Sequence, residues 1–250
     1  MSELTQTISD RGNLVGTLVS ISSPALAESL SATGIDWLFY DLEHSVMSLA
    51  DVQAMIQAMR PGCLSMIRVE EPQSVFVKRA LDTGCAAIIV PQVNSPQIAR
   101  AIVQAGKFPP AGSRSVGLGR ALSYGVTLGQ GVKQENERTA LIVQIEHRDA
   151  VAEVDEIANI DGVDALFVGP YDLSGSFGVP GQLDDARVQE AINTTLRAAK
   201  RARKPAGIFV GTAEAAKREF GRGFEFAAVG SDLGRLSMAT KAMVDETRRR

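Results

Sequence analysis

The sequence contains little cysteine, with Cys63 and Cys85 as the only two in 250 residues. Two isolated cysteines inside apolar runs form neither a disulfide framework nor a zinc knuckle. No apolar run approaches the ~20 residues that cross a bilayer, and the polar start MSELTQTISDRG lacks the apolar core of a signal peptide. These absences predict a soluble protein of the reducing cytoplasm with no membrane partner.

A strong charge of one sign is also absent, since 26 Lys and Arg stand against 29 Asp and Glu. The formal net charge of −3 gives no general attraction to phosphate backbones. The basic runs at 197–204 and 248–250 are interpreted as solvated helix faces or last helical turns, where cations suit the helix dipole. No nucleic-acid partner is expected.

Eight short, mostly apolar runs alternate with helix-like segments along the chain. They lie at 14–19, 36–41, 64–69, 86–91, 140–146, 164–169, 206–210 and 226–230. Continuous apolar runs are typical of strands that are buried on both faces. Regular βα units of this kind predict an α/β fold, a single (β/α)₈ TIM barrel over residues 1–250.

One connection, at about 108–138, is longer than the others and rich in glycine. Connections of more than about 12–15 residues in a compact domain are usually functional. We therefore interpret it as an active-site wall or lid with a short helix or two. The apolar residues Val116, Leu118 and Phe209 are expected near the mouth of the site.

Two neighbouring apolar runs end in an acid, LIVQIE at Glu146 and ALFVGPYD at Asp172. The carboxyl ends of barrel strands meet on one face, so these acids can share one divalent cation. Carboxylate and water ligands favour Mg²⁺ or Mn²⁺, with Co²⁺ as a third candidate. An acid at a strand end can also cap a helix or pair with an arginine, but two on neighbouring strands favour the metal.

Two further runs carry groups for proton transfer and for binding of negative charge. IDWLFYDLEH ends with Asp41 and His44, and Asp41 can accept from one ring nitrogen of His44 and leave the other as a base. A purely structural histidine is the alternative. Arg68, inside SMIRV, either forms an ion pair with Glu70 or Glu43 or clamps a carboxylate or a developing oxyanion.

Lysine is missing where a Schiff-base enzyme would need it. None of the seven lysines lies within a predicted strand or at its carboxyl end. A covalent imine mechanism requires a desolvated lysine in such a position. The sequence therefore disfavours a lysine-dependent aldolase.

These segments resemble the HpcH/HpaI family of metal-dependent class II pyruvate aldolases, which are barrels of the phosphoenolpyruvate/pyruvate type. The matching strings run in order from about residue 16 to about 240: IDWLFYDLEH, MIRV, LDTGCAAIIVPQV, FPPAGSRSVG, LIVQIE, GVDALFVGPYDLS and FAAVGSDLG. The loop LGRALSYG differs from the form of the dicarboxylate-aldehyde enzymes. The sequence therefore does not predict which aldehyde is the acceptor.

The resemblance implies reversible retro-aldol cleavage of 4-hydroxy-2-oxo acids to pyruvate, or hydroxypyruvate, and an aldehyde. It implies a divalent ion on Glu146 and Asp172, and Arg68 beside the keto oxygen. Gln144 is expected near the ligand. Backbone amides around Gly169 and Pro170 are expected to receive the substrate carboxylate.

The resemblance also implies how protons move and how subunits assemble. His44 and Asp41 would transfer the proton, and Glu43 would lie behind them. Asp82, in LDTG, would be presented to the site of a neighbouring subunit. The family pattern is a homo-hexamer with an exchanged C-terminal helix.

Two other functions are compatible with the same scaffold. One is an enolate-condensing synthase, citrate-synthase-like or using an acyl thioester, although the sequence shows no basic groove for a coenzyme. The other is a non-catalytic barrel with a structural metal. The combination of Asp41, His44, Arg68, Glu146 and Asp172 argues against the second.

Overall fold

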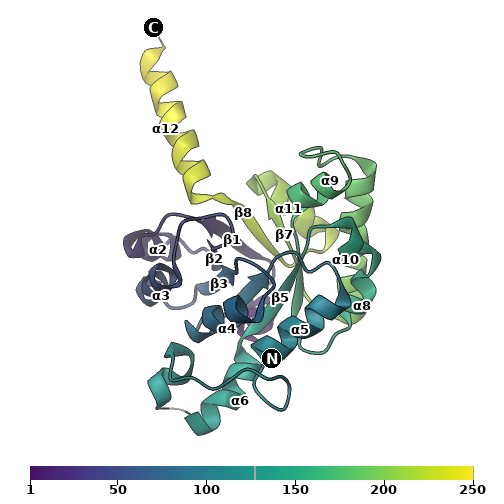
Figure 1. The fold of residues 1–250 in the computed structure, drawn as a ribbon. Coiled ribbons are helices and arrows are strands. Elements are labelled where there is room, and N and C mark those ends of the chain that lie inside the picture. Colours follow the sequence, from purple (N-terminus) through teal and green to yellow (C-terminus); the bar gives the residue numbers. More distant parts are fainter. Residues whose placement is uncertain (127, 250) are drawn as a thin grey trace.

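The computed structural model describes residues 1–126 and 128–249, and its strands close into a parallel barrel (Figure 1). The strands are β1 (Leu14–Val19), β2 (Trp37–Asp41), β3 (Leu64–Arg68), β4 (Ala87–Val90), β5 (Ala140–Ile145), β6 (Ala165–Val168), β7 (Ala206–Val210) and β8 (Phe226–Ser231). Each strand pairs with the next, and β8 pairs with β1, so the sheet has no free edge. The predicted (β/α)₈ fold is confirmed.

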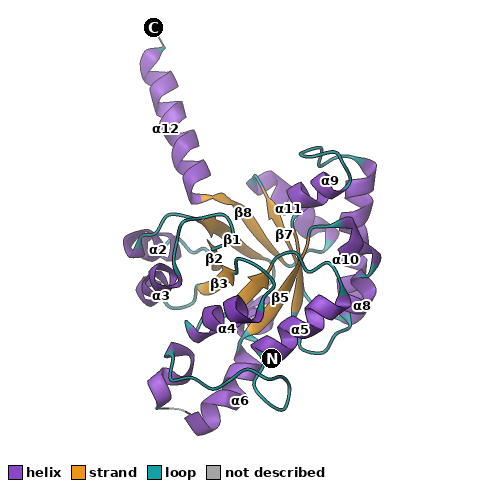
Figure 2. Cartoon of the chain, in the orientation of Figure 1, coloured by secondary structure: helices purple, strands orange, loops and turns teal. Residues whose placement is uncertain are grey.

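Helices surround this barrel on its outside (Figure 2). They are α1 (Glu3–Arg11), α2 (Pro24–Ser31), α3 (Leu49–Ala58), α4 (Ser74–Asp82), α5 (Pro96–Gly106), α6 (Leu128–Arg138), α7 (Arg148–Ala152), α8 (Val154–Ala158), α9 (Pro170–Ser176), α10 (Ala186–Ala202), α11 (Ala213–Arg222) and α12 (Asp232–Arg248). Within the described residues, no helix combines the length and the apolar character that crossing a bilayer requires.

Local sequence explains where several of these helices begin. The side chains of Ser23 and Ser95 accept from backbone N–H groups three residues later, and a proline follows each serine at the first helical position. Such caps satisfy amides that have no partner inside the helix. Ser48 and Asp51 form a reciprocal capping box at the start of α3. These starts orient the helices that return the chain to the next strand.

The lower interior of the barrel is filled by aromatic rings. Trp37, Phe39, Phe167 and Phe226 pack with centroids 5.6–6.3 Å apart. A Cβ at Gly16 would lie 2.2 Å from the Trp37 ring, so glycine makes room for it. This apolar floor closes the barrel from below and leaves the carboxyl ends of the strands as its open mouth.

The C-terminal helix α12 leaves the mouth side of the barrel and projects away from it (Figure 1). Its apolar residues are exposed in the described chain: Leu233, Leu236, Met238 and Met243. An unpartnered apolar helix face of this kind usually marks a contact surface. The exchange of this helix between subunits stays a prediction.

The long connection lies at the opposite end of the barrel, which corrects its predicted place. It runs from the end of α5 to the start of β5 and contains a 3₁₀ helix at Arg120–Gly125 followed by α6. Because α5 runs back along the barrel, both ends of this connection lie at the amino ends of the strands. Figure 1 shows α6 on the side away from α9 and α12. The connection therefore does not border the mouth of its own chain.

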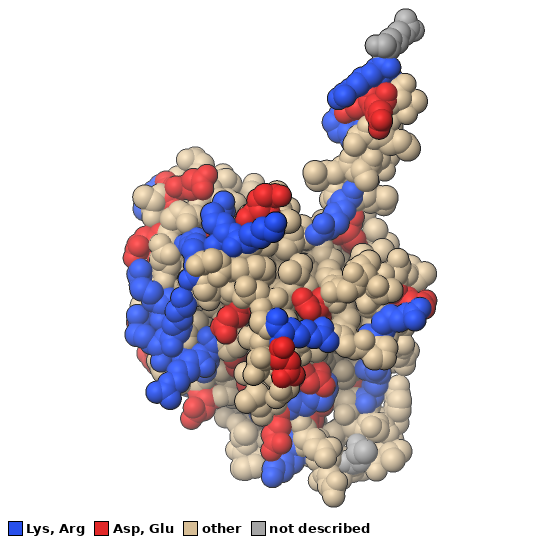
Figure 3. Space-filling view, turned by 180° about the vertical axis from the view of Figure 1, so that it is seen from behind, with Lys and Arg blue, Asp and Glu red and all other residues tan. Residues whose placement is uncertain are grey.

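The basic run at 197–204 behaves as predicted, as a solvated end of α10. Arg197 pairs with Glu190 at 2.6 Å, and Arg201 pairs with Asp155, both on the surface. In the view from behind, Lys and Arg gather along one side, while charges of both signs are mixed elsewhere (Figure 3). Local ion pairs thus involve Arg197 and Arg201 of this run.

Candidate active site

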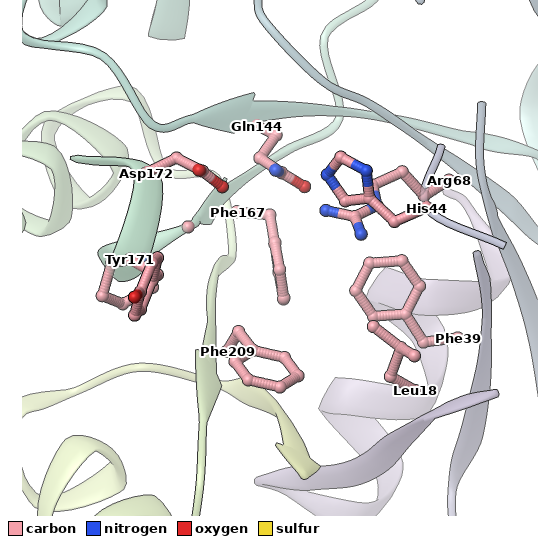
Figure 4. Close-up of a pocket in the computed structure, with 11 residues that line it drawn as sticks. Leu18, Phe39, His44, Arg68, Gln144, Phe167, Tyr171, Asp172 and Phe209 are labelled. Atoms are coloured by element: carbon pink, nitrogen blue, oxygen red, sulfur yellow. The ribbon is translucent and has the colours of Figure 1, made fainter. Parts of the chain in front are cut away.

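Two adjoining cavities open at the mouth of the barrel, and both are lined by His44 and Asp172. The first has a volume of about 160 Å³. Figure 4 shows its polar side chains on one side, opposite an apolar wall of Leu18, Phe39, Phe167 and Phe209. The second cavity is lined mainly by polar residues: Glu43, His44, Gln92, Asn94, Glu146, His147, Asp172, Gly175 and Ser176.

Glu146 follows directly after β5 and is almost fully buried, with 7% exposed. Its Oε1 accepts from the Gln92 N–H at 2.7 Å, and its Oε2 contacts Gln144 Nε2. Burial raises the pKa of Glu146, as do the charges of Glu43 and Asp172, while the hydrogen bonds from Gln144 and Gln92 oppose the rise. A cation between these carboxylates would offset the unfavourable burial of their negative charges.

Asp172 reaches the same place by a different route. β6 ends at Val168, and Asp172 lies in the first turn of α9 rather than at a strand end. Gly169 makes the turn fit, because a Cβ there would lie 3.1 Å from Glu146 Oε2 and 3.3 Å from Gln144 Nε2. The structure thus brings Glu146 and Asp172 to one site, as the sequence predicted.

Arg68, the last residue of β3, is held by two acids. Its Nε and Nη2 donate to Asp41 at 2.9 and 2.8 Å, and its Nη1 lies 3.1 Å from Glu43 Oε2. Burial disfavours the cation, but the Asp41 hydrogen bond and the nearby negative charges outweigh burial and raise the pKa of Arg68. A guanidinium has five N–H donors, so Arg68 keeps donors for a ligand in the cavity that it lines.

The predicted pairing of Asp41 with the His44 ring is wrong in this structure. Asp41 uses its oxygens for Arg68 and for the backbone N–H groups of Glu43 and His44. The His44 side chain is 65% exposed, and its Nε2 lies 3.7 Å from Glu43 Oε2. Glu43 therefore takes the place beside the His44 ring that was predicted for Asp41.

The predicted carboxylate-binding amides at Gly169 and Pro170 also need correction. The Gly169 N–H donates to Ile145 O at 3.2 Å, and proline has no N–H. The next amides, of Tyr171 and Asp172, belong to the first turn of α9 and have no carbonyl partner within the helix. Gly169 and Pro170 still line the cavity, but these two following amides are the free donors.

The remaining predicted residues separate into two groups. Gln144 and Phe209 line the first cavity. Asp82 lies at the end of α4, where Arg114 donates to it at 2.6 Å, and the segment with Val116 and Leu118 passes beside it. All three lie at the amino ends of the strands, so the predicted place of Val116 and Leu118 near their own chain's mouth is wrong.

Sequence reasoning missed Gln92, Asn94 and Tyr171. Gln92 has a left-handed backbone, with φ +55°, which costs a non-glycine residue about 1–3 kcal/mol. Asn94 Oδ1 is buried without a hydrogen-bond partner among the described residues, as is Gln144 Oε1. No pattern in the sequence marks Gln92 or Asn94. Their place directly after a predicted strand was the available signal.

A metal ion would find two carboxylates here rather than a closed set of ligands. Over residues 1–126 and 128–249, no group of three or more His, Cys, Asp or Glu side chains is arranged to hold an ion. The buried oxygens beside Glu146 still fit a cation, because Gln144 Oε1 lacks a hydrogen-bond donor and Glu43 and Asp172 add negative charge nearby. Catalytic sites commonly leave part of the metal shell to substrate or water.

The fold and this mouth define a (β/α)₈ barrel enzyme with a carboxylate-rich site at the carboxyl ends of its strands. A family model described as HpcH/HpaI aldolase/citrate lyase matches residues 15–239. The chain therefore belongs to the HpcH/HpaI aldolase/citrate lyase family, which confirms the resemblance that its motifs showed.

Named relatives and a solved structure agree with that assignment. The chain is 38% identical to the 2-dehydro-3,6-dideoxy-6-sulfogluconate aldolase of Pseudomonas putida, over 92% of this chain and 91% of the relative. It is 35% identical to the hydroxypyruvate/pyruvate aldolase of Sagittula stellata, over 91% and 90%. An HpcH/HpaI family protein from Burkholderia cenocepacia J2315 superposes over 100% of both chains, with a TM-score of 0.93 and 33% identity.

Proposed function

We propose that this protein is a class II aldolase, a carbon–carbon lyase that reversibly cleaves 4-hydroxy-2-oxo acids to pyruvate, or hydroxypyruvate, and an aldehyde. The observation that carries the proposal is the meeting of four side chains at the two adjoining cavities of the mouth. His44 and Asp172 line both cavities, Arg68 lines the first and Glu146 lines the second. The names of relatives at 35% and 38% identity support the reaction class. Among the described residues no lysine lines either cavity, so no side chain is present there for an imine.

Glu146 and Asp172 would hold the metal, with Mg²⁺ or Mn²⁺ as first candidates and Co²⁺ as a third. The fit rests on the donor set: a buried carboxylate, a neighbouring carboxylate and unpartnered amide oxygens are all hard oxygen ligands. A bound divalent ion would polarise the keto group of the substrate and stabilise negative charge as it develops.

Arg68 and the start of α9 would position the 2-oxo acid. The free N–H groups of Arg68 would face the keto oxygen, and Asp41 would hold the guanidinium in that orientation through two hydrogen bonds. The amides of Tyr171 and Asp172 would donate to the substrate carboxylate. Gln144, on the same wall, would fix the ligand against Gly169.

His44 would move the proton between the substrate hydroxyl and solvent. It lines both cavities, and its exposed ring can exchange its proton with water. Glu43, 3.7 Å from Nε2, would stabilise the protonated ring. In cleavage His44 would take the proton of the C4 hydroxyl as the C3–C4 bond breaks, and the enolate left behind would gain a proton at C3 to give pyruvate. In synthesis a pyruvate methyl proton would leave, the C3–C4 bond would form, and His44 would return a proton to the new alkoxide.

The test is pyruvate release from a panel of 4-hydroxy-2-oxo acids, followed by reduction of the released pyruvate. The wild-type protein is expected to cleave at least one member, and Glu146→Gln is expected to cleave none. If purified wild-type protein releases no 2-oxo acid from any member, the proposed reaction is wrong. A thioester-dependent condensation instead would support the synthase alternative, for which neither cavity offers a cationic coenzyme groove.

We further propose a homo-oligomer, with a homo-hexamer as the family pattern. Asp82 is 45% exposed at the amino ends of the strands, away from its own chain's mouth, so any site that it serves would belong to another subunit. The segment that passes beside Asp82 leads into a stretch with several exposed apolar residues: Val116, Leu118, Tyr124 and Val126. The exposed face of α12 offers a second contact surface.

Light scattering should show a multimer of the 26.6 kDa chain. Mixed oligomers of Asp82→Ala and His44→Ala subunits should regain activity that neither variant has alone. A fully active monomer, or a mixture without recovery, would remove the shared-site model. The cytoplasm stays our prediction for location, on the basis of the two cysteines, which are both free thiols.

A further inference from the structure

Gln92 connects the two acidic parts of the site. Its backbone N–H donates to Glu146 Oε1 at 2.7 Å, and its side-chain Nε2 donates to Glu43 Oε1 at 3.2 Å. We propose that Gln92 is a positioning residue whose left-handed backbone holds Glu146 in a metal-binding orientation, while its side chain ties Glu43 to the same place. The inference rests on the proposed metal role of Glu146.

The backbone contact depends on an unusual local conformation. β4 ends at Val90, Pro91 supplies no N–H, and Gln92 turns the chain with φ +55°. The Asn94 N–H then donates to Gln92 O at 2.9 Å and closes a tight turn. A residue at position 92 that disfavours the left-handed region would shift the backbone next to this N–H. The bond to Glu146 would then lengthen or break.

The hydrogen bond matters because Glu146 is otherwise held on only one side. Its Oε2 contacts Gln144 Nε2 and lies against Gly169, while its Oε1 accepts from Gln92. With a donor on each oxygen, the carboxylate cannot rotate about its last bond. Partners of this kind orient metal ligands, and their loss typically costs about 10–100-fold in metal affinity or activity.

The side-chain contact acts on a different part of the site. Gln92 is exposed, so its hydrogen bond to Glu43 competes with water and contributes less than the backbone contact. Glu43 lies 3.1 Å from Arg68 Nη1 and 3.7 Å from His44 Nε2. A substitution that changes the backbone conformation at Gln92 should therefore lower metal affinity, and a substitution that removes only its side chain should lower kcat.

Two substitutions separate these effects. Gln92→Val keeps an N–H but carries a β-branched side chain that disfavours the left-handed region. Gln92→Gly keeps the N–H, adopts that region freely and removes the side chain. Mn²⁺ affinity of the full-length chain is measured by calorimetry and by the spin resonance of free Mn²⁺, with the melting temperature as a check on folding.

Gln92→Val should bind Mn²⁺ roughly 10–100-fold more weakly than the wild type, and Gln92→Gly should bind it equally well. Gln92→Gly should also lower kcat with little change in KM. If Gln92→Val does not fold, Gln92→Thr against Gln92→Gly gives the same comparison, because threonine is also β-branched. Wild-type affinity in a folded Val or Thr variant would overturn the inference, as would an equal loss in Gln92→Gly.

The Mn²⁺ measurements test the positioning role of Gln92 independently of the proposed reaction. If Mn²⁺ affinity follows the predicted order but no 4-hydroxy-2-oxo acid is cleaved, the positioning role of Gln92 stands and the proposed reaction fails. If the wild type cleaves its substrate with bound metal while both variants bind Mn²⁺ normally, the reaction stands and the positioning role fails.

Discussion

The two ends of the barrel bury charged groups in different ways. At the amino ends of the strands, Lys107 donates to Asn136 O and Thr139 O at 3.0 Å each and pairs with Asp164 at 3.2 Å. Its three donors are all used. Glu135 nearby accepts from Arg138 and from Thr139. Arg114 keeps one unpartnered donor there, its Nε, although it is already paired with Asp82.

At the mouth, by contrast, the unsatisfied atoms are acceptors that gather around one cavity system. Asn94 Oδ1 and Gln144 Oε1 are buried without a hydrogen-bond partner among the described residues. Buried polar atoms are normally paired, because leaving one unpaired costs about 1–3 kcal/mol. Satisfied charge at one end thus contributes to stability, while unsatisfied acceptors at the other end leave places for a cation and a substrate.

The largest expected effect is at the mouth, in Glu146→Gln. The substitution keeps the shape of the side chain but removes the charge that would hold the metal. Charge stabilisation by a metal is worth several kcal/mol, so the rate of cleavage should fall by about 10³-fold or more. Steady-state pyruvate release and Mn²⁺ titration measure it, with an unchanged melting temperature as the control. Wild-type kcat in this variant would exclude Glu146 as a ligand.

His44→Ala should have the next largest effect. The change removes the proposed base but leaves the groups that bind the 2-oxo acid, so kcat should fall about 10²–10⁴-fold with little change in KM. Exchange of the pyruvate methyl protons in D₂O should slow with it. An unchanged exchange rate would assign the base to another group, with Glu43 as the next candidate.

Phe209→Ala should change the choice of aldehyde rather than the donor chemistry. Phe209 lies on the apolar wall, away from Asp172 and Gln144 on the polar side (Figure 4). Changes of methylene size in such pockets are worth about 1–3 kcal/mol, so relative kcat/KM values should shift roughly 10–200-fold. Val116→Ala is the matched comparison. Val116→Ala should shift the relative kcat/KM values only if Val116 reaches the mouth of a neighbouring subunit. If Phe209→Ala shows the same relative kcat/KM values for the aldehydes as the wild type, Phe209 does not contact the acceptor.

Lys107→Met should affect the other end alone. It leaves the carbonyls of Asn136 and Thr139 without their donor, which should lower the free energy of unfolding by about 1–3 kcal/mol. kcat should stay at the wild-type value, because Lys107 lies at the end of the barrel away from the mouth. Urea unfolding measures the first quantity. A large loss of kcat in a folded variant would break the distinction between the two ends.

The sequence was most informative about features that depend on local pattern. Buried strands with apolar runs were all recognised, and residues directly after or within them, such as Glu146, Arg68 and Gln144, lie where the strand ends predicted. The direction of the chain explains one error. The connection at 108–138 follows a helix, so it returns to the amino ends of the strands and carries Val116 and Leu118 away from the mouth.

The other errors arose from contacts between distant segments. Asp41 pairs with Arg68, 27 residues away, and this bidentate contact takes the oxygens that were assigned to His44. The left-handed backbone of Gln92 has no signal in its residue type, because glutamine has no special preference for that region. Backbone conformation and competition among partners are set by the tertiary structure, so motif spacing alone did not predict them.

The most direct test of the account is the metal dependence of cleavage. After exhaustive treatment with EDTA, the wild-type protein should release no pyruvate from its best 4-hydroxy-2-oxo acid, and added Mn²⁺, Mg²⁺ or Co²⁺ should restore the release. Glu146→Gln should stay inactive under both conditions. Full activity after chelation, or trapping of a substrate imine by borohydride, would contradict the central claim that Glu146 and Asp172 hold a catalytic metal at the mouth.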